Sequence, residues 1–195
     1  MTPAPDPAAF YADQATRFKT AWATLSAEQM LSPVARHLPT SPARVLDIGA
    51  GTGTLASWLA ARGHDVTATE PVAAFHGALG PVWSTARLPK LTGITGPYDL
   101  ALVVGVWHHV PPAERRQSMA RISGLLRPES RLIMALRHGP LPDDRPAWPN
   151  PTEQVVDLAH DVWLATLDTV ETNAQQPQNR AAGVTFTWLV FQNTA

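Results

Sequence analysis

The stretch "ARVLDIGAGTGTLASWLAARG", residues 43–63, decides the fold of this chain. It opens with a short apolar run at 44–48, of the kind that forms a buried strand. Three glycines then occupy alternate positions, 49, 51 and 53, and a helical pattern follows at 54–62. Gly63 suits the left-handed residue that ends many helices. This succession predicts either a tight structural turn or a binding site for a ligand.

The same rhythm of strand, turn and helix continues along the chain and predicts a mainly parallel sheet with right-handed crossovers. Strands are expected at 44–48, 65–69, 82–86, 98–107 and 130–136, and helices at 54–62, 72–79, 111–128 and 152–163. The last two strands, 168–174 and 184–192, are joined by about ten residues and predict an antiparallel pair. The sequence "SAEQ" at 26–29 is typical of a helix start within a helical N-terminal region.

Length and composition limit the classes of protein. A chain of 195 residues fits one domain, which we expect to span 1–195. The net charge of −1 gives no electrostatic reason to expect a nucleic-acid or membrane partner. Without cysteine there is no disulfide or thiolate, and the histidines lack metal-ligand spacing, so no metal is expected. No apolar run approaches the roughly 20 residues of a membrane span, and no secretory signal is present, so a cytoplasmic protein is expected.

Asp47 indicates which ligand the glycine turn would hold. Dinucleotide sites prefer G-x-G-x-x-G after an apolar strand end, with a pyrophosphate on the helix N-terminus. Here the spacing is G-x-G-x-G, Thr54 stands where the third glycine would fall, and Asp47 comes two residues before the first glycine. A carboxylate repels a pyrophosphate and attracts a cation. The pattern therefore favours an aminoacyl-sulfonium nucleoside, which carries an ammonium group and a positive sulfur.

Glu70 supplies the second half of this signal. It follows the second predicted strand, in "DVTATEP", about 20 residues after the glycines. A carboxylate at that position can accept both ribose hydroxyls of an adenosine. Glu70 alone does not discriminate between ligands, since dinucleotide proteins use an acid in the same way. Asp47 and the glycine spacing do discriminate.

Four segments, "VLDIGAGTG", "ATEP", "YDLALVVGVWHHV" and "ISGLLRPESRLIMAL", resemble in order the motifs of class I S-adenosylmethionine-dependent methyltransferases. The resemblance covers roughly residues 43–136. It implies an α/β, Rossmann-like sheet of seven mostly parallel strands in the order 3-2-1-4-5-7-6, with an antiparallel last strand and helices on both faces. It also implies S-adenosylmethionine as cofactor and S-adenosylhomocysteine as product. For the assembly, a monomer or homodimer is expected. Residues 1–40 would form a helical lid, 43–136 the cofactor-binding core, and 152–195 a helix with the terminal strand pair.

The resemblance assigns a set of cofactor-binding positions. Asp47 and the glycine turn would line the methionine end, Glu70 would hold the ribose, and Tyr11 would shield the cofactor or belong to a helix packed on the sheet edge. Thr85 and Ala86 stand where the family often has an aspartate for the adenine. The full set is Tyr11, Asp47, Gly49, Ala50, Gly51, Gly53, Glu70, Pro71, Thr85, Ala86, Val104 and Gly105.

Other residues could face the methyl acceptor, the molecule that would receive the methyl group, and each of them has two interpretations. His108 and His109 leave the strongest strand and could act as a general base, or they could be packing residues of the turn. Trp107 could contact the adenine or the sulfonium, or lie in the core. Arg137 and His138 could bind a polar or anionic acceptor, or hold the proline-rich loop at 137–151.

The acceptor is expected to be a small molecule. The segments that would contact it are the N-terminal helices, the turn at 104–110 and the loop at 137–151, which are rich in proline and carry Phe10, Tyr11, Trp107 and Trp148. Two other functions remain open. An NAD-dependent oxidoreductase is disfavoured by Asp47 and Thr54, and a protein that binds the cofactor without transferring methyl groups is compatible with the absence of an indisputable base.

Overall fold

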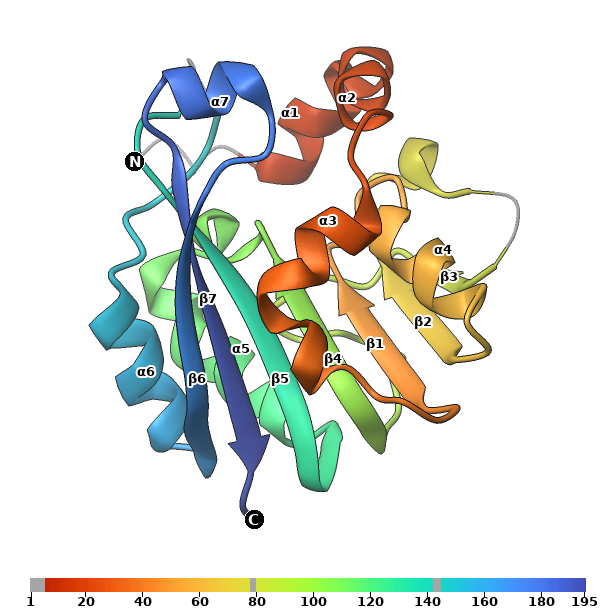
Figure 1. Ribbon diagram of the computed structural model, residues 1–195, viewed down its shortest axis with the longest axis vertical. Helices are drawn as coiled ribbons and strands as arrows, with labels where there is room; N and C mark the ends of the chain where they lie inside the picture. Colours follow the sequence, from red (N-terminus) through yellow and green to blue (C-terminus); the bar gives the residue numbers. More distant parts are fainter. Residues whose placement is uncertain (1–5, 78–79, 142–144) are drawn as a thin grey trace.

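The computed structural model describes residues 6–77, 80–141 and 145–195, and strands alternate with helices over most of that length (Figure 1). The strands are β1 (Arg44–Ile48), β2 (Asp65–Thr69), β3 (Val82–Ser84), β4 (Tyr98–Val104), β5 (Leu126–His138), β6 (Leu164–Asn173) and β7 (Thr185–Asn193). The α-helices are α1 (Pro7–Asp13), α2 (Ala15–Trp22), α3 (Ala27–Leu31), α4 (Thr54–Ala60), α5 (Pro112–Ser123), α6 (Thr152–His160) and α7 (Pro177–Ala181). Three 3₁₀ segments are η1 (Ser32–His37), η2 (Ala73–Phe75) and η3 (Trp107–His109).

The seven strands form one sheet in the order β3-β2-β1-β4-β5-β7-β6. The pairs from β3 to β5 are parallel, and β7 runs antiparallel to both β5 and β6. This confirms the expected fold class, including the strand order and the antiparallel last strand. Among the described residues, no helix is long and apolar enough to cross a bilayer.

Helices cover both faces of the sheet because successive side chains of a strand point to opposite sides. Leu46 of β1 lies in a buried cluster with Met119 of α5 and Val155 of α6. The neighbouring Val45 lies in a second cluster, with Leu31 of α3 and Leu59 of α4. The continuously apolar pattern of the central strands therefore reflects burial on both faces.

Local differences from the sequence prediction concern element bounds. The predicted helix at 72–79 is wrong over its described part, where only η2 is helical; residues 78–79 lie outside the described residues. The predicted strand at 98–107 ends at Val104, because Gly105 has a positive φ of 68° and the chain then turns into η3. The predicted start at Ser26 is confirmed, since its hydroxyl accepts a hydrogen bond from the Gln29 amide.

The parallel strands place their carboxyl ends at one edge of the sheet. The glycine turn after β1, Glu70 after β2, and η3 after β4 all follow strands that end there. Helices α1, α2 and α7 lie over this edge, at the top of the view in Figure 1. The N-terminal and C-terminal parts of the chain thus meet above the strand ends.

Candidate active site

A cavity of about 630 Å³ opens at this edge, between the strand ends and the covering helices. A volume of this size is typical of small-ligand sites. Most of the residues that the sequence indicated lie in its wall. These are Tyr11, Asp47, Gly49, Ala50, Gly51, Glu70, Pro71, Val104, Gly105, His108, His109 and Arg137.

Asp47 is the least compensated acid of the cavity. Its side chain is 2% exposed, and its Oδ2 atom has no hydrogen-bond partner among the described residues. Burial, and the neighbouring Glu70 carboxylate, raise its pKa to about 7. A buried carboxylate without a partner is costly, and a cation placed beside it would offset that cost.

Glu70 ties the glycine turn to the end of β2. Its Oε2 accepts a hydrogen bond from the Gly51 amide at 3.0 Å, and its Oε1 accepts one from the Val72 amide at 2.9 Å. Burial raises the pKa of this carboxyl, whereas the two amides lower it. Because each carboxylate oxygen has two lone pairs, both oxygens can still accept one hydrogen bond from a ligand hydroxyl.

The glycines of the turn serve different needs. A Cβ atom placed on Gly49 would lie 2.4 Å from Val106 Cγ2, so a close approach of two chain segments requires glycine there. A Cβ on Gly51 would meet only the ring of Trp22, at 3.3 Å, on the cavity side. Gly51 is therefore the glycine whose missing side chain leaves room in the cavity itself.

Tyr11 and His109 form a hydrogen-bonded pair in the cavity wall. The Pro146 carbonyl lies 2.6 Å from His109 Nδ1 and can only accept, so Nδ1 carries the proton. His109 Nε2 then accepts from the Tyr11 hydroxyl at 2.9 Å. Burial, together with Arg145 and Arg137, lowers the pKa of His109 to about 4. His109 is thus a neutral imidazole at physiological pH, with its free lone pair already occupied by Tyr11.

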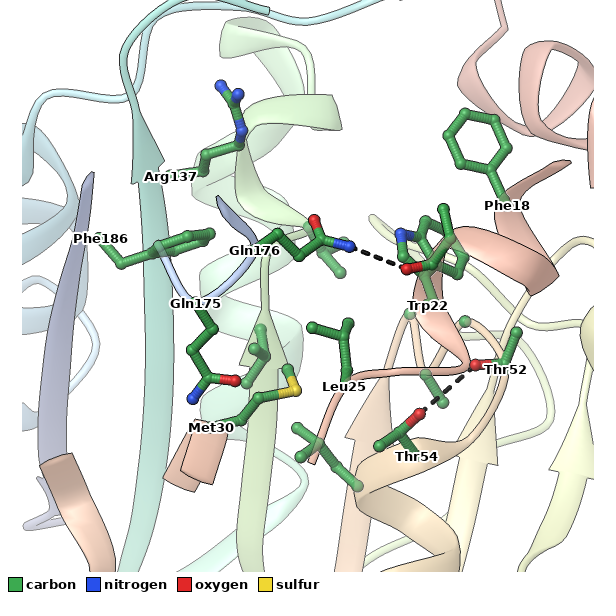
Figure 2. A pocket seen from close by; sticks show the side chains of 18 of the residues that line it. Phe18, Trp22, Leu25, Met30, Thr52, Thr54, Arg137, Gln175, Gln176 and Phe186 are labelled. Atoms are coloured by element: carbon green, nitrogen blue, oxygen red, sulfur yellow. Dashed lines mark hydrogen bonds between the residues drawn. The ribbon is translucent and has the colours of Figure 1, made fainter. Parts of the chain in front are cut away.

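Aromatic side chains of α1 and α2 close the cavity from above. The Tyr11 ring centroid lies 4.7 Å from that of Phe18 and 5.8 Å from that of Trp22, and Trp22 also contacts Phe75. Gln176, just before α7, donates from Nε2 to the Ala21 carbonyl at 2.9 Å (Figure 2). The two covering segments are therefore joined to each other across the cavity.

Several predicted residues lie outside the cavity. Trp107 is fully buried in the core under α5, so of its two interpretations the structure shows core packing. His138 bonds to the Thr187 hydroxyl and lines a separate hollow. Gly53 packs against the Trp83 ring, which a Cβ would approach within 2.7 Å. Thr85 and Ala86 also do not line the cavity.

Other cavity residues were not singled out from the sequence. They are Phe18, Trp22, Leu25 and Met30 from the N-terminal region, Arg145 from the proline-rich loop, and Gln175, Gln176, Phe186 and Trp188 from the C-terminal part. Figure 2 shows Arg137 and Phe186 on the sheet side, facing Phe18 and Trp22 across the opening. Phe18, Trp22 and Leu25 follow helical spacing in the sequence, but this spacing does not determine which surface their apolar stripe covers.

The strand order and the helices on both faces define an α/β protein of the Rossmann-like class, with an acid at the ends of β1 and β2 in the cavity wall. The chain belongs to the methyltransferase domain family, whose model matches residues 21–172. An uncharacterized methyltransferase of Mycobacterium tuberculosis is 37% identical over 105 residues, which cover 49% of this chain and 40% of that relative. The similarity thus spans less than half of the relative's length.

Similar folds occur among solved structures. The 1,6-didemethyltoxoflavin-N1-methyltransferase of Burkholderia thailandensis, solved with bound 1,6-didemethyltoxoflavin and S-adenosylhomocysteine, has a TM-score of 0.75 at 20% identity, over 96% of this chain and 87% of that one. Magnesium protoporphyrin IX methyltransferase of Synechocystis, solved with S-adenosylmethionine, has a TM-score of 0.75 at 17% identity, over all of both chains. A [4+2]-cyclase has a TM-score of 0.80 at 14% identity, over 98% and 97%. At these identities the likeness shows the shared fold.

Proposed function

We propose that the chain is an S-adenosylmethionine-dependent methyltransferase that acts on a small-molecule acceptor. The observation that carries the proposal is Asp47 Oδ2 in the cavity wall, two residues before the glycine turn, which has no hydrogen-bond partner in the described part of the chain. An ammonium group of the cofactor would supply the missing partner, whereas a pyrophosphate would place further negative charge beside the carboxylate. Family membership and the folds of methyltransferases solved with this cofactor or its product support the same proposal.

The chain's own residues would bind and shield this cofactor, which supplies a methyl group on a positively charged sulfur. Asp47 would hold the ammonium group, Glu70 the ribose hydroxyls, and Gly51 would leave space for the methionine part. Tyr11 and Trp22 would exclude water from above, which makes α1 and α2 a lid. Alignment of acceptor and methyl group in such a site contributes much of the rate enhancement.

A second candidate is binding of the same cofactor without methyl transfer. His109 favours it, because its Nε2 is occupied by Tyr11 and its pKa of about 4 makes it a weak base at pH 7. The fold is also shared with a [4+2]-cyclase. An acceptor that arrives already deprotonated would need no base, so these observations do not weigh against transfer to an anion.

Calorimetric binding and thermal unfolding with S-adenosylmethionine, S-adenosylhomocysteine and NAD test the proposal. At 100 times its dissociation constant a ligand stabilises the fold by about 2.7 kcal/mol. We expect this from the two sulfur ligands and not from NAD, and a loss of about tenfold or more in affinity in Asp47→Asn. Asp65→Asn, which changes an exposed acid paired with Arg44, is the matched control. Stabilisation by NAD alone would refute the proposal.

Transfer is then distinguished from binding by mass spectrometry of cell extract incubated with labelled cofactor. New labelled small molecules are expected with the wild type, and clearly smaller amounts of them with Asp47→Asn at cofactor concentrations below saturation. Binding without any labelled product would favour the second candidate. The expected cytoplasmic location and the expected monomer or homodimer remain predictions from the sequence.

A further inference from the structure

Among the described residues, two acids and three arginines line the cavity, and one of these arginines, Arg17, lies on the covering helix α2 and donates to Gln14 Oε1. Asp47 and Glu70 stand at the ends of β1 and β2, whereas Arg137 belongs to β5 and Arg145 to the loop that follows it. In the sheet order, β1 and β5 are separated by β4, which puts the two strands about 10 Å apart. One end of the cavity is thus acidic and the other carries guanidinium groups.

Neither Arg137 nor Arg145 has a carboxylate partner among the residues that the structure describes. The ion pairs among the described residues are made by Arg36, His37, Arg44, Arg87, Arg116 and Arg127. Arg137 is 9% exposed and donates to the carbonyls of Gly139 and Pro140, and its other N–H groups have no hydrogen-bond partner among the described residues. Arg145 Nε is buried and has no hydrogen-bond partner in the described part of the chain.

The two guanidinium groups lie close enough to affect the same neighbours. Each lowers the pKa of both His108 and His109, after the larger effect of burial. Each of these histidines is therefore neutral near pH 7, and the positive charge of this end resides on the arginines. Arg137 is buried and the Nε atom of the half-buried Arg145 is buried, and neither side chain has an anionic partner among the described residues. A bound anion would offset the cost of burying these groups.

The surroundings of the arginines are apolar. Arg145 lies over the rings of Phe18 and Tyr11, at 5.1 and 5.5 Å from their centroids. Figure 2 shows Phe186 next to Arg137 on the sheet side, with Leu25 and Met30 farther along the same opening. A ligand at this end would contact the guanidinium groups at one point and aliphatic or aromatic side chains around them.

We propose that the methyl acceptor is a small organic anion with an apolar body, whose anionic group is bound by Arg137 and Arg145. The role of this anion as methyl acceptor rests on the proposed function, whereas the anion site rests on the arginines themselves. The planar guanidinium matches a carboxylate or phosphate with paired hydrogen bonds. Arg137 and Arg145 place this anion opposite the acids that would hold a cationic cofactor, so the two ligands attract each other across the cavity.

The test compares benzoate with benzamide, its neutral analogue of nearly the same shape, on protein saturated with S-adenosylhomocysteine. Calorimetry gives the affinities, and NMR follows the Arg145 Nε–H and His109 ring signals. We expect benzoate to bind in the millimolar range or tighter, to shift the Arg145 signal, and to raise the pKa of His109. Benzamide should bind about tenfold more weakly or not at all.

Variants separate the arginine site from general charge. Arg145→Gln should weaken benzoate binding about tenfold and leave S-adenosylhomocysteine binding unchanged. Arg145→Lys, which keeps the charge over the aromatic rings, should bind benzoate with intermediate affinity. Arg116→Gln is the control, because Arg116 is an exposed residue of α5 that pairs with Asp161. This substitution removes the same charge far from the arginine site.

Three results would overturn the anion site: no benzoate binding, equal affinity for benzoate and benzamide, or unchanged benzoate affinity in Arg145→Gln. Failure of S-adenosylhomocysteine to bind would instead refute the proposed function. In that case the benzoate titration of the ligand-free chain would still decide whether the arginines form an anion site.

Discussion

Replacing Asp47 by asparagine should stabilise the protein and abolish tight cofactor binding at the same time. The carboxyl ionises near pH 3.8 in a flexible chain and near pH 7 in the folded protein, because of burial and the Glu70 carboxylate. The folded state therefore holds this proton more tightly, and the group favours folding at low pH. That contribution is lost as the pH rises from about 4 to about 7.

The magnitude follows from the two pKa values. A difference of about three units corresponds to about 4 kcal/mol of destabilisation once Asp47 is ionised, above pH 7. Asparagine has similar size and no charge. We therefore expect Asp47→Asn to be more stable than the wild type at pH 8, by up to about 4 kcal/mol, and nearly equal to it at pH 4.

Urea unfolding at both pH values, with Asp65→Asn as the control, measures this difference. The same samples give the S-adenosylmethionine affinity by calorimetry, which should fall about tenfold or more in Asp47→Asn. The opposite signs of the two effects matter. If the carboxylate served only to stabilise the fold, neutralising it would make the protein less stable. A variant that is less stable than the wild type at pH 8 would refute the reasoning.

Three further predictions concern the cavity. In the wild type, S-adenosylmethionine should bind about eightfold more weakly at pH 6 than at pH 7.5, because Asp47, whose pKa is about 7, must lose its proton, and calorimetry of Asp47→Asn should show no such dependence. Gly51→Ala should bind the cofactor about tenfold more weakly and lose about 1 kcal/mol of stability. Gly49→Ala, whose new Cβ clashes with Val106, should lose about 2 kcal/mol of stability by urea unfolding. Equal effects of the two substitutions on affinity and on stability would contradict the distinction between the two glycines. Gln176→Ala should speed amide hydrogen exchange in α2 about fivefold, since it removes the hydrogen bond between the two covering segments, and unchanged exchange would show that this bond does not hold them.

The sequence predicted the fold and the acidic end of the cavity for the same reason. In a parallel sheet, strand ends meet at one edge, so Asp47 and Glu70 could be placed together from the ends of two apolar runs. The strand order came from the resemblance of the motifs. The bounds of short elements were less accurate, as at η2, because the apolar residues of that segment pack without completing a helix.

The acceptor end was not predictable from pattern alone. In η3 the chain turns sharply, so Trp107 enters the core while His109 faces the cavity, and no periodicity separates them. Arg145 and Gln176 come from irregular segments whose positions depend on tertiary contacts. Their role becomes visible only when the N-terminal helices and the β6–β7 connection are seen over the same strand ends, as in Figure 1.

A crystal structure of the protein with S-adenosylhomocysteine tests the central claim most directly. The account predicts the amino group of the ligand at hydrogen-bond distance from the Asp47 carboxylate and the ribose hydroxyls at that distance from Glu70. The homocysteine chain should pass Gly51 beneath Tyr11 and Trp22. A ligand bound away from the end of β1, or with its ribose directed away from Glu70, would contradict it.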